Sequence, residues 1–122
     1  VESHQDAATA PVRLYYTGWS SSTGEADWGL RPLFAGDKTP PSMYNISYYK
    51  NPTVDADIMK ALGTTDRAEK TKLYTEVQEE IWKDAPWAFL VTEKLLYATS
   101  KKLTGMYVMP DANYFFEEID LQ

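Results

Sequence analysis

The sequence contains no cysteine and only one histidine, His4. Without cysteine the chain has no disulfide framework and no thiolate chemistry. No apolar run approaches the roughly 20 residues that span a bilayer, and the longest such run extends only from Pro86 to Val91. The net charge of -6 argues against binding to nucleic acid or to an anionic membrane surface. The remaining composition is that of an ordinary globular domain.

The motifs of common catalytic sites are missing as well. There is no nucleophile elbow, no P-loop, no dinucleotide fingerprint and no metal-binding motif, so we predict no cofactor and no metal. The serines Ser20 to Ser22 could serve a small hydrolase, but a catalytic triad needs a positioned base and only His4 is available. Glu25 and Asp27 could form a glycosidase pair, although two acids so close together more often cap a helix or face solvent. We therefore predict that the chain is not an enzyme.

One polar, aromatic stretch stands out against this background. The apolar run Val12 to Tyr16 predicts a strand, and a loop rich in hydroxyls, carboxylates and indoles follows it. Such a loop at a strand end suits a small-molecule site, and the alternative is a surface turn whose tryptophans pack inward. The carboxylate of Asp27 in this loop could bind an ammonium group of a ligand, or it could cap the helix that follows. Both roles are equally open. The predicted ligand-binding residues are Trp19, Ser20, Ser21, Ser22, Thr23, Asp27 and Trp28.

Two helices are predicted after the loop, besides a short one that opens at Ala26. Asn51 and Pro52 form a typical helix start, and Val54, Ile58 and Leu62 follow at a spacing of four residues. Gly63 is expected to end that helix in the left-handed conformation. Asp66 then begins a second helix in a capping box with Glu69. Its buried stripe is predicted to contain Leu73, Val77 and Ile81, and Pro86 is expected to close it.

The remaining apolar segments predict strands. These are Trp87 to Val91, Leu95 to Ala98 and Gly105 to Met109, in addition to the strand that precedes the loop. The predicted fold class is therefore α/β, with two main helices packed on a mixed sheet of about four strands. A stand-alone carbohydrate-binding module remains an alternative because of the many aromatic residues, although such modules are commonly β-sandwiches.

The order of these segments resembles a known family. The chain is similar to the C-terminal part of the dipeptide/oligopeptide/nickel class of periplasmic substrate-binding proteins, solute-binding protein family 5. Within it, the resemblance is strongest to glutathione-binding subunits of ABC importers. The matching segments are 18–20, 23–28, 49–55, 65–70, 73–74, 81–87, 100–105 and 120–122.

This resemblance implies a bilobed type II periplasmic-binding-protein fold that captures a solute and chemically changes nothing. Residues 1–11 would be a polar leader or linker, 12–106 part of the second lobe, and 107–122 a tail that returns toward the first lobe. The chain, which does not begin with methionine, is thus expected to be part of a longer periplasmic protein. The implied partners are a small peptide such as glutathione, the missing N-terminal lobe and the ABC permease.

The resemblance also bears on the ligand's amino terminus. Peptide-binding relatives hold that group with a Trp-x-x-Asp motif. In this chain Trp19 matches the tryptophan of the motif, but Ser22 stands where the aspartate would be. This departure fits a ligand other than an ordinary peptide, such as the γ-linked tripeptide glutathione. Asp27 is expected to take over the ammonium group, while Trp19 would support the ligand and Ser20 to Thr23 would hydrogen-bond it.

Overall fold

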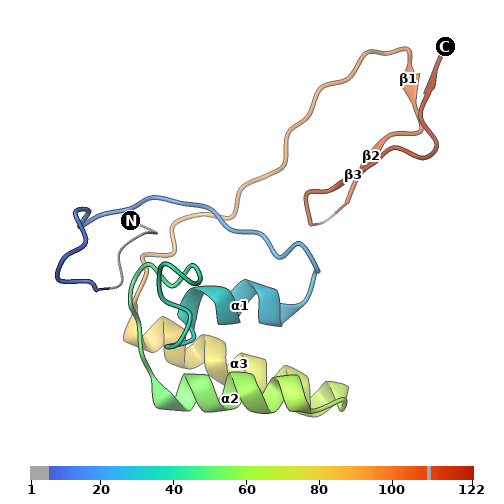
Figure 1. Ribbon diagram of the computed structural model, residues 1–122. Helices are drawn as coiled ribbons and strands as arrows, with labels where there is room; N and C mark the ends of the chain where they lie inside the picture. Colours follow the sequence, from blue (N-terminus) through green and yellow to red (C-terminus); the bar gives the residue numbers. More distant parts are fainter. Residues whose placement is uncertain (1–5, 110) are drawn as a thin grey trace.

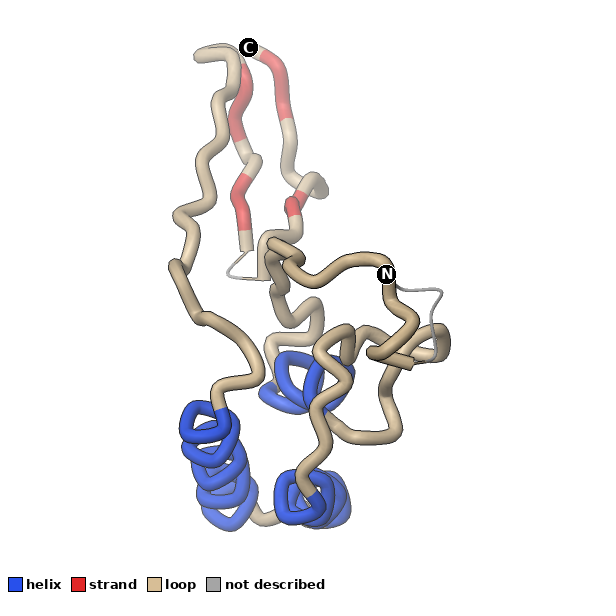
Figure 2. Tube along the Cα trace, turned by 90° about the vertical axis from the view of Figure 1, so that its left-hand side faces the viewer, coloured by secondary structure: helices blue, strands red, loops and turns tan. Residues whose placement is uncertain are grey.

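The computed structural model describes residues 6–109 and 111–122, so the single histidine lies outside the described residues. Three helices form a packed body, and a long extended segment leads from it to a separate two-stranded ribbon at the C-terminus (Figure 1). The view turned by 90° shows the same separation of body and ribbon (Figure 2). Within the described part of the chain, no helix is both long and apolar enough to cross a membrane.

The two long helices begin where the sequence predicts. Helix α2 (Pro52–Gly63) is capped by Asn51, whose side chain accepts hydrogen bonds from the first turn, and helix α3 (Arg67–Asp84) is capped by Asp66. The predicted left-handed stop at the end of α2 is wrong, because the next residue, Thr64, leaves the helix in an extended conformation. The left-handed residue is Ala85 instead, which ends α3 with a φ of 48° just before the predicted closing proline.

Helix α1 (Ala26–Phe34) lies against the hairpin formed by α2 and α3 (Figure 1). It is longer than the short helix predicted, and its C-terminal residues Leu33 and Phe34 are buried. The core unites one face of each helix and contains Leu33, Phe34, Ala35, Val54, Ile58, Val77 and Ile81. Leu73 is buried in a smaller neighbouring cluster, so the predicted stripe of α3 is confirmed. That of α2 is confirmed at its first two positions, whereas Leu62 is 42% exposed and Ala61 is buried in its place.

The predicted strands at 12–16, 87–91 and 95–98 are wrong for this chain. These segments are extended, but among the described residues none of them pairs in a ladder. Leu14 is 91% exposed and Leu96 is 87% exposed. At the start of the second segment Trp87 packs on the core, with its ring centroid 5.0 Å from that of Phe34, and the half-exposed Phe89 lies 6.2 Å from the same ring. A strand needs a neighbour for its backbone groups, and the described chain supplies none here.

The strands that do form are short and antiparallel. β1 (Leu103–Thr104) pairs with β4 (Asp120–Leu121), and β2 (Tyr107–Val108) pairs with β3 (Tyr114–Phe115). The predicted mixed sheet under the helices is therefore corrected to two small ladders in a ribbon apart from them. The coarser prediction, a chain of helices and strands, agrees with the structure. The helical body also contradicts the alternative of an all-β sandwich.

Candidate functional site

The loop that the sequence singles out is folded by its own hydroxyl groups. Ser21 donates a hydrogen bond of 2.8 Å to the carbonyl of Glu25, and Thr23 accepts one of 3.2 Å from the Glu25 amide. Gly24 completes the turn with a φ of 69°. Two of the hydroxyls predicted to bind a ligand thus already hold the loop in place. The hydroxyls of Ser20 and Ser22 make no hydrogen bond to the residues that the structure describes.

Three aromatic rings meet where the loop joins α1, and we name them the aromatic platform: Trp19, Trp28 and Tyr44. The centroid of the Trp19 ring lies 6.1 Å from that of Trp28 and 5.1 Å from that of Tyr44. The Trp19 indole N–H donates a 2.9 Å hydrogen bond to the carbonyl of Trp28. Trp19 is 37% exposed and Tyr44 41% exposed, so ring surface remains open to solvent.

Sequence reasoning missed Tyr44 as a site residue. Its neighbour Asn45 is fully buried and fixes the connection between α1 and α2. The side-chain amide of Asn45 donates to the carbonyls of Ala35 and Tyr49 at 3.0 and 2.8 Å, and its oxygen accepts from Ser47 and from the Tyr49 amide. The aromatic run 44–49 was a signal in the sequence, but no pattern indicated which of its rings would reach Trp19.

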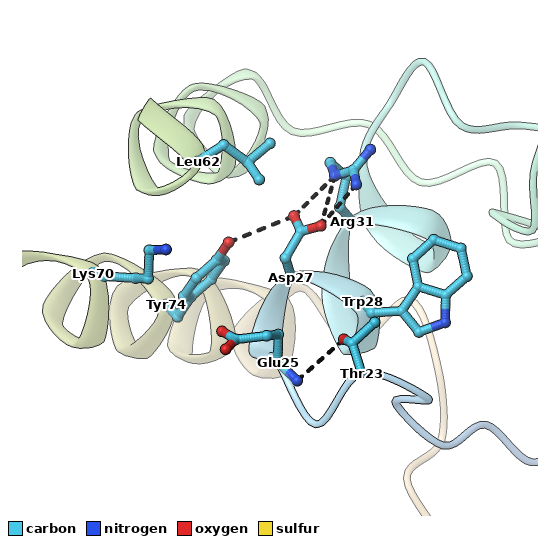
Figure 3. Close-up of a pocket in the computed structure, with 8 residues that line it drawn as sticks. All are labelled: Thr23, Glu25, Asp27, Trp28, Arg31, Leu62, Lys70 and Tyr74. Atoms are coloured by element: carbon cyan, nitrogen blue, oxygen red, sulfur yellow. Dashed lines mark hydrogen bonds and ion pairs between the residues drawn. The ribbon is translucent and has the colours of Figure 1, made fainter. Parts of the chain in front are cut away.

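A charged cluster is centred on Asp27, the neighbour of Trp28 in α1, which faces Arg31 and Tyr74 (Figure 3). The Asp27 carboxylate accepts three hydrogen bonds from the Arg31 guanidinium, the shortest of 2.7 Å, and a longer one of 3.5 Å from the Tyr74 hydroxyl. Burial and the nearby Asp27 charge raise the pKa of Tyr74 to about 12, so its hydroxyl remains a donor at neutral pH. Asp27 lies inside α1 and does not cap it, which contradicts the capping alternative.

This cluster forms one wall of an open pocket of about 410 Å³ between the three helices. Its lining comes from the loop, α1, α2 and α3, namely Thr23, Glu25, Asp27, Trp28, Arg31, Leu62, Lys70 and Tyr74 (Figure 3). Neither Glu25 nor Lys70 forms an ion pair with another described residue. The pocket therefore offers one unpaired charge of each sign beside a neutralised pair.

The predicted site residues thus fall into three places. Thr23, Asp27 and Trp28 line the pocket, Trp19 packs against Trp28 in the aromatic platform, and Ser20 to Ser22 belong to the connecting loop. His4, the base considered for a serine hydrolase, lies outside the described residues. In the described part of the chain no group of three or more histidines, aspartates or glutamates could hold a metal ion. The arrangement is suited to binding by ring faces and charges.

Three known proteins that are similar to the chain share one name. No family model matches the chain. The glutathione-binding protein GsiB of Pectobacterium atrosepticum is 62% identical over 110 residues, which cover 90% of this chain and 21% of that protein. The proteins of the same name from Salmonella typhi and Escherichia coli K12 are each 54% identical over 111 residues, 91% of this chain and 22% of theirs.

The resemblance predicted from the sequence is therefore confirmed. The chain matches a C-terminal part of substrate-binding proteins that are named as glutathione-binding. It spans only about a fifth of the length of these relatives. What the relatives bind is a property of those whole proteins.

Proposed function

We propose that this chain supplies one wall of the ligand site in a periplasmic substrate-binding protein that captures glutathione or a related small peptide for an ABC importer. The observation that carries this proposal is the identity of 54% to 62% with glutathione-binding proteins over nine-tenths of the chain. All of these relatives are binding proteins by name, and a binding role agrees with a site built from rings and charges.

The pocket and the aromatic platform match the chemistry of glutathione. This tripeptide carries an ammonium group, carboxylates and planar peptide bonds. Glu25 offers an unpaired carboxylate for the ammonium, and Lys70 offers an unpaired ammonium for a carboxylate. Ring faces favour planar and apolar groups, whereas a few placed polar groups fix orientation.

The proposed ligand-binding residues are those predicted from the sequence, with Glu25, Tyr44 and Lys70 added. Trp19 and Tyr44 would support the ligand, and Ser20 and Ser22 would hydrogen-bond it, because their hydroxyls are not used within the loop. In this proposal Asp27 acts together with Arg31, since its carboxylate is already held by that guanidinium.

The extended segments support the idea of a larger protein. Residues 88–99 and 11–20 are exposed along their length and rich in apolar side chains. We propose that they join a sheet with the rest of a longer chain, that 12–106 belongs to its second lobe and that 107–122 returns to its first lobe. Closure of such lobes on a ligand supplies much of the buried contact. The chain alone is then expected to bind weakly.

A segment exchange tests the proposal. The matching segment of the Pectobacterium atrosepticum glutathione-binding protein is replaced by this chain, and glutathione is titrated calorimetrically into the chimera and into the unaltered protein. We expect the dissociation constants to agree within about tenfold, a difference of about 1.4 kcal/mol. A folded chimera that releases no heat with glutathione would overturn the proposed ligand.

A further inference from the structure

Helix α1 contains a proline, Pro32, in its last turn. Proline has no backbone N–H, and its ring crowds the carbonyl four residues earlier, which here is that of Trp28. The helix therefore cannot supply the usual donor to this carbonyl. The donor comes instead from outside the helix, because the indole N–H of Trp19 makes a 2.9 Å hydrogen bond to the Trp28 oxygen.

The carbonyl of Pro32 itself is also used by the aromatic platform. It accepts a 3.2 Å hydrogen bond from the backbone N–H of Tyr44. Pro32 is fully buried, so its ring is fixed by the surrounding core. Trp19 and Tyr44 are thus both tethered to peptide carbonyls of α1 that lie four residues apart, at positions 28 and 32.

We infer that Pro32 is a positioning residue for the ligand site, because it leaves the Trp28 carbonyl free to orient the indole of Trp19. This inference rests on the proposed function for its consequence in binding. Because the Trp19 N–H is used within the chain, a ligand meets the ring faces of the platform and not an indole donor. The subsite therefore selects a planar or apolar part of the ligand.

The role of Pro32 is tested in the chain itself by restoring a backbone N–H at position 32. Pro32→Ala and Pro32→Val both reintroduce a backbone N–H, and they differ in volume, so a shared effect cannot come from a cavity. We expect the Trp19 indole N–H to exchange with solvent at least about threefold faster in both variants, measured by NMR, as its carbonyl partner is shared with the new donor. Pro52→Ala, at the first position of α2, is the matched control and should leave that signal unchanged.

A double-mutant cycle in the segment-exchange chimera tests the effect on binding. Trp19→Phe keeps a ring and removes the N–H. In the otherwise unchanged chimera, Pro32→Ala should weaken glutathione binding about threefold to tenfold. In the chimera that already carries Trp19→Phe, Pro32→Ala should have no further effect. Equal losses in both backgrounds, or an unchanged indole signal in either Pro32 variant, would overturn the inference. The indole measurement needs no ligand, so it still decides the inference if glutathione does not bind.

Discussion

Asp27 holds Arg31 through three hydrogen bonds of 2.7 to 3.1 Å within one turn of α1. Both side chains are largely withdrawn from water, with 17% and 26% of their surface exposed. The carboxylate that the sequence suggests as an ammonium anchor is therefore already neutralised. Its hydrogen bond to Tyr74 also links α1 to α3, so the pair shapes the pocket wall.

The strength of this pair can be measured by a double-mutant cycle with Asp27→Asn and Arg31→Gln. A bidentate, partly buried ion pair should show a coupling of about 1 kcal/mol in the free energy of unfolding, because charge-assisted hydrogen bonds are stronger than neutral ones. Urea denaturation of the single and double variants gives that coupling. The exposed pair of Lys72 and Glu76, whose closest atoms are 3.7 Å apart, provides the control cycle and should show less than about 0.5 kcal/mol. Additive effects for both pairs would contradict this prediction.

Replacing the buried Asn45 should cost more stability than any surface change. Asn45→Ala removes two donors and leaves the carbonyls of Ala35 and Tyr49 without them. Each unsatisfied buried group costs about 1 to 3 kcal/mol, so we expect unfolding to become easier by about 2 to 4 kcal/mol in urea denaturation. Asn113→Ala, in the exposed turn of the ribbon, should cost under about 1 kcal/mol. A similar small loss at Asn45 would show that the connection between α1 and α2 does not depend on it.

How far the fold could be predicted depends on where the stabilising contacts lie. The long helices are local structures with caps at Asn51 and Asp66, so the sequence determines their N-termini. The predicted strands depend on partners far away in the chain, and Leu14 or Leu96 gives no indication whether such a partner exists. The turn residues were misjudged because Thr64 ends α2 without a left-handed glycine, whereas Ala85 adopts that conformation with no sequence signal.

The site was predictable in part for a related reason. Trp19 and Trp28 lie nine residues apart in the stretch that the sequence singles out, so their proximity follows from short spacing. Tyr44 reaches the Trp19 ring only through the fold that Asn45 stabilises. The partner of Asp27 lies four residues later on the same helix, and helical spacing could have indicated Arg31.

The ribbon should depend on the glycine at position 105. Its φ is 76°, and a side chain there would collide with the backbone carbonyl of Glu118. Gly105→Ala is therefore expected to break the cross-strand contact between Tyr107 and Phe115, which is seen as loss of their nuclear Overhauser effects. Gly63→Ala is the matched control, because open space surrounds that position and the change should favour α2 by up to about 1 kcal/mol. A ribbon that persists in Gly105→Ala would contradict the prediction.

Acid should weaken the junction between the start of α2 and the end of α3. Hydrogen bonds from the Tyr49 hydroxyl, 2.6 Å, and from the Asn51 side chain lower the pKa of Asp84 below its ordinary value of 3.8. The Asp84 carboxyl thus binds a proton less readily in the folded state than in the unfolded state. The stabilisation from these hydrogen bonds is present above the ordinary pKa of 3.8 and is lost as the pH falls through the lowered pKa. Asp84→Asn should show a smaller loss of stability between about pH 5 and pH 2 than the parent. Identical acid profiles in urea denaturation would contradict this.

The most direct test of the account is the glutathione affinity of the segment-exchange chimera with and without the Trp19 ring. Trp19→Ala removes the centre of the aromatic platform, and we expect the dissociation constant to rise at least about tenfold in calorimetry. Trp82→Ala is the matched control, since that tryptophan is 70% exposed on α3 and should leave the affinity unchanged. An equal affinity for Trp19→Ala and the parent would contradict the claim that this loop holds the ligand.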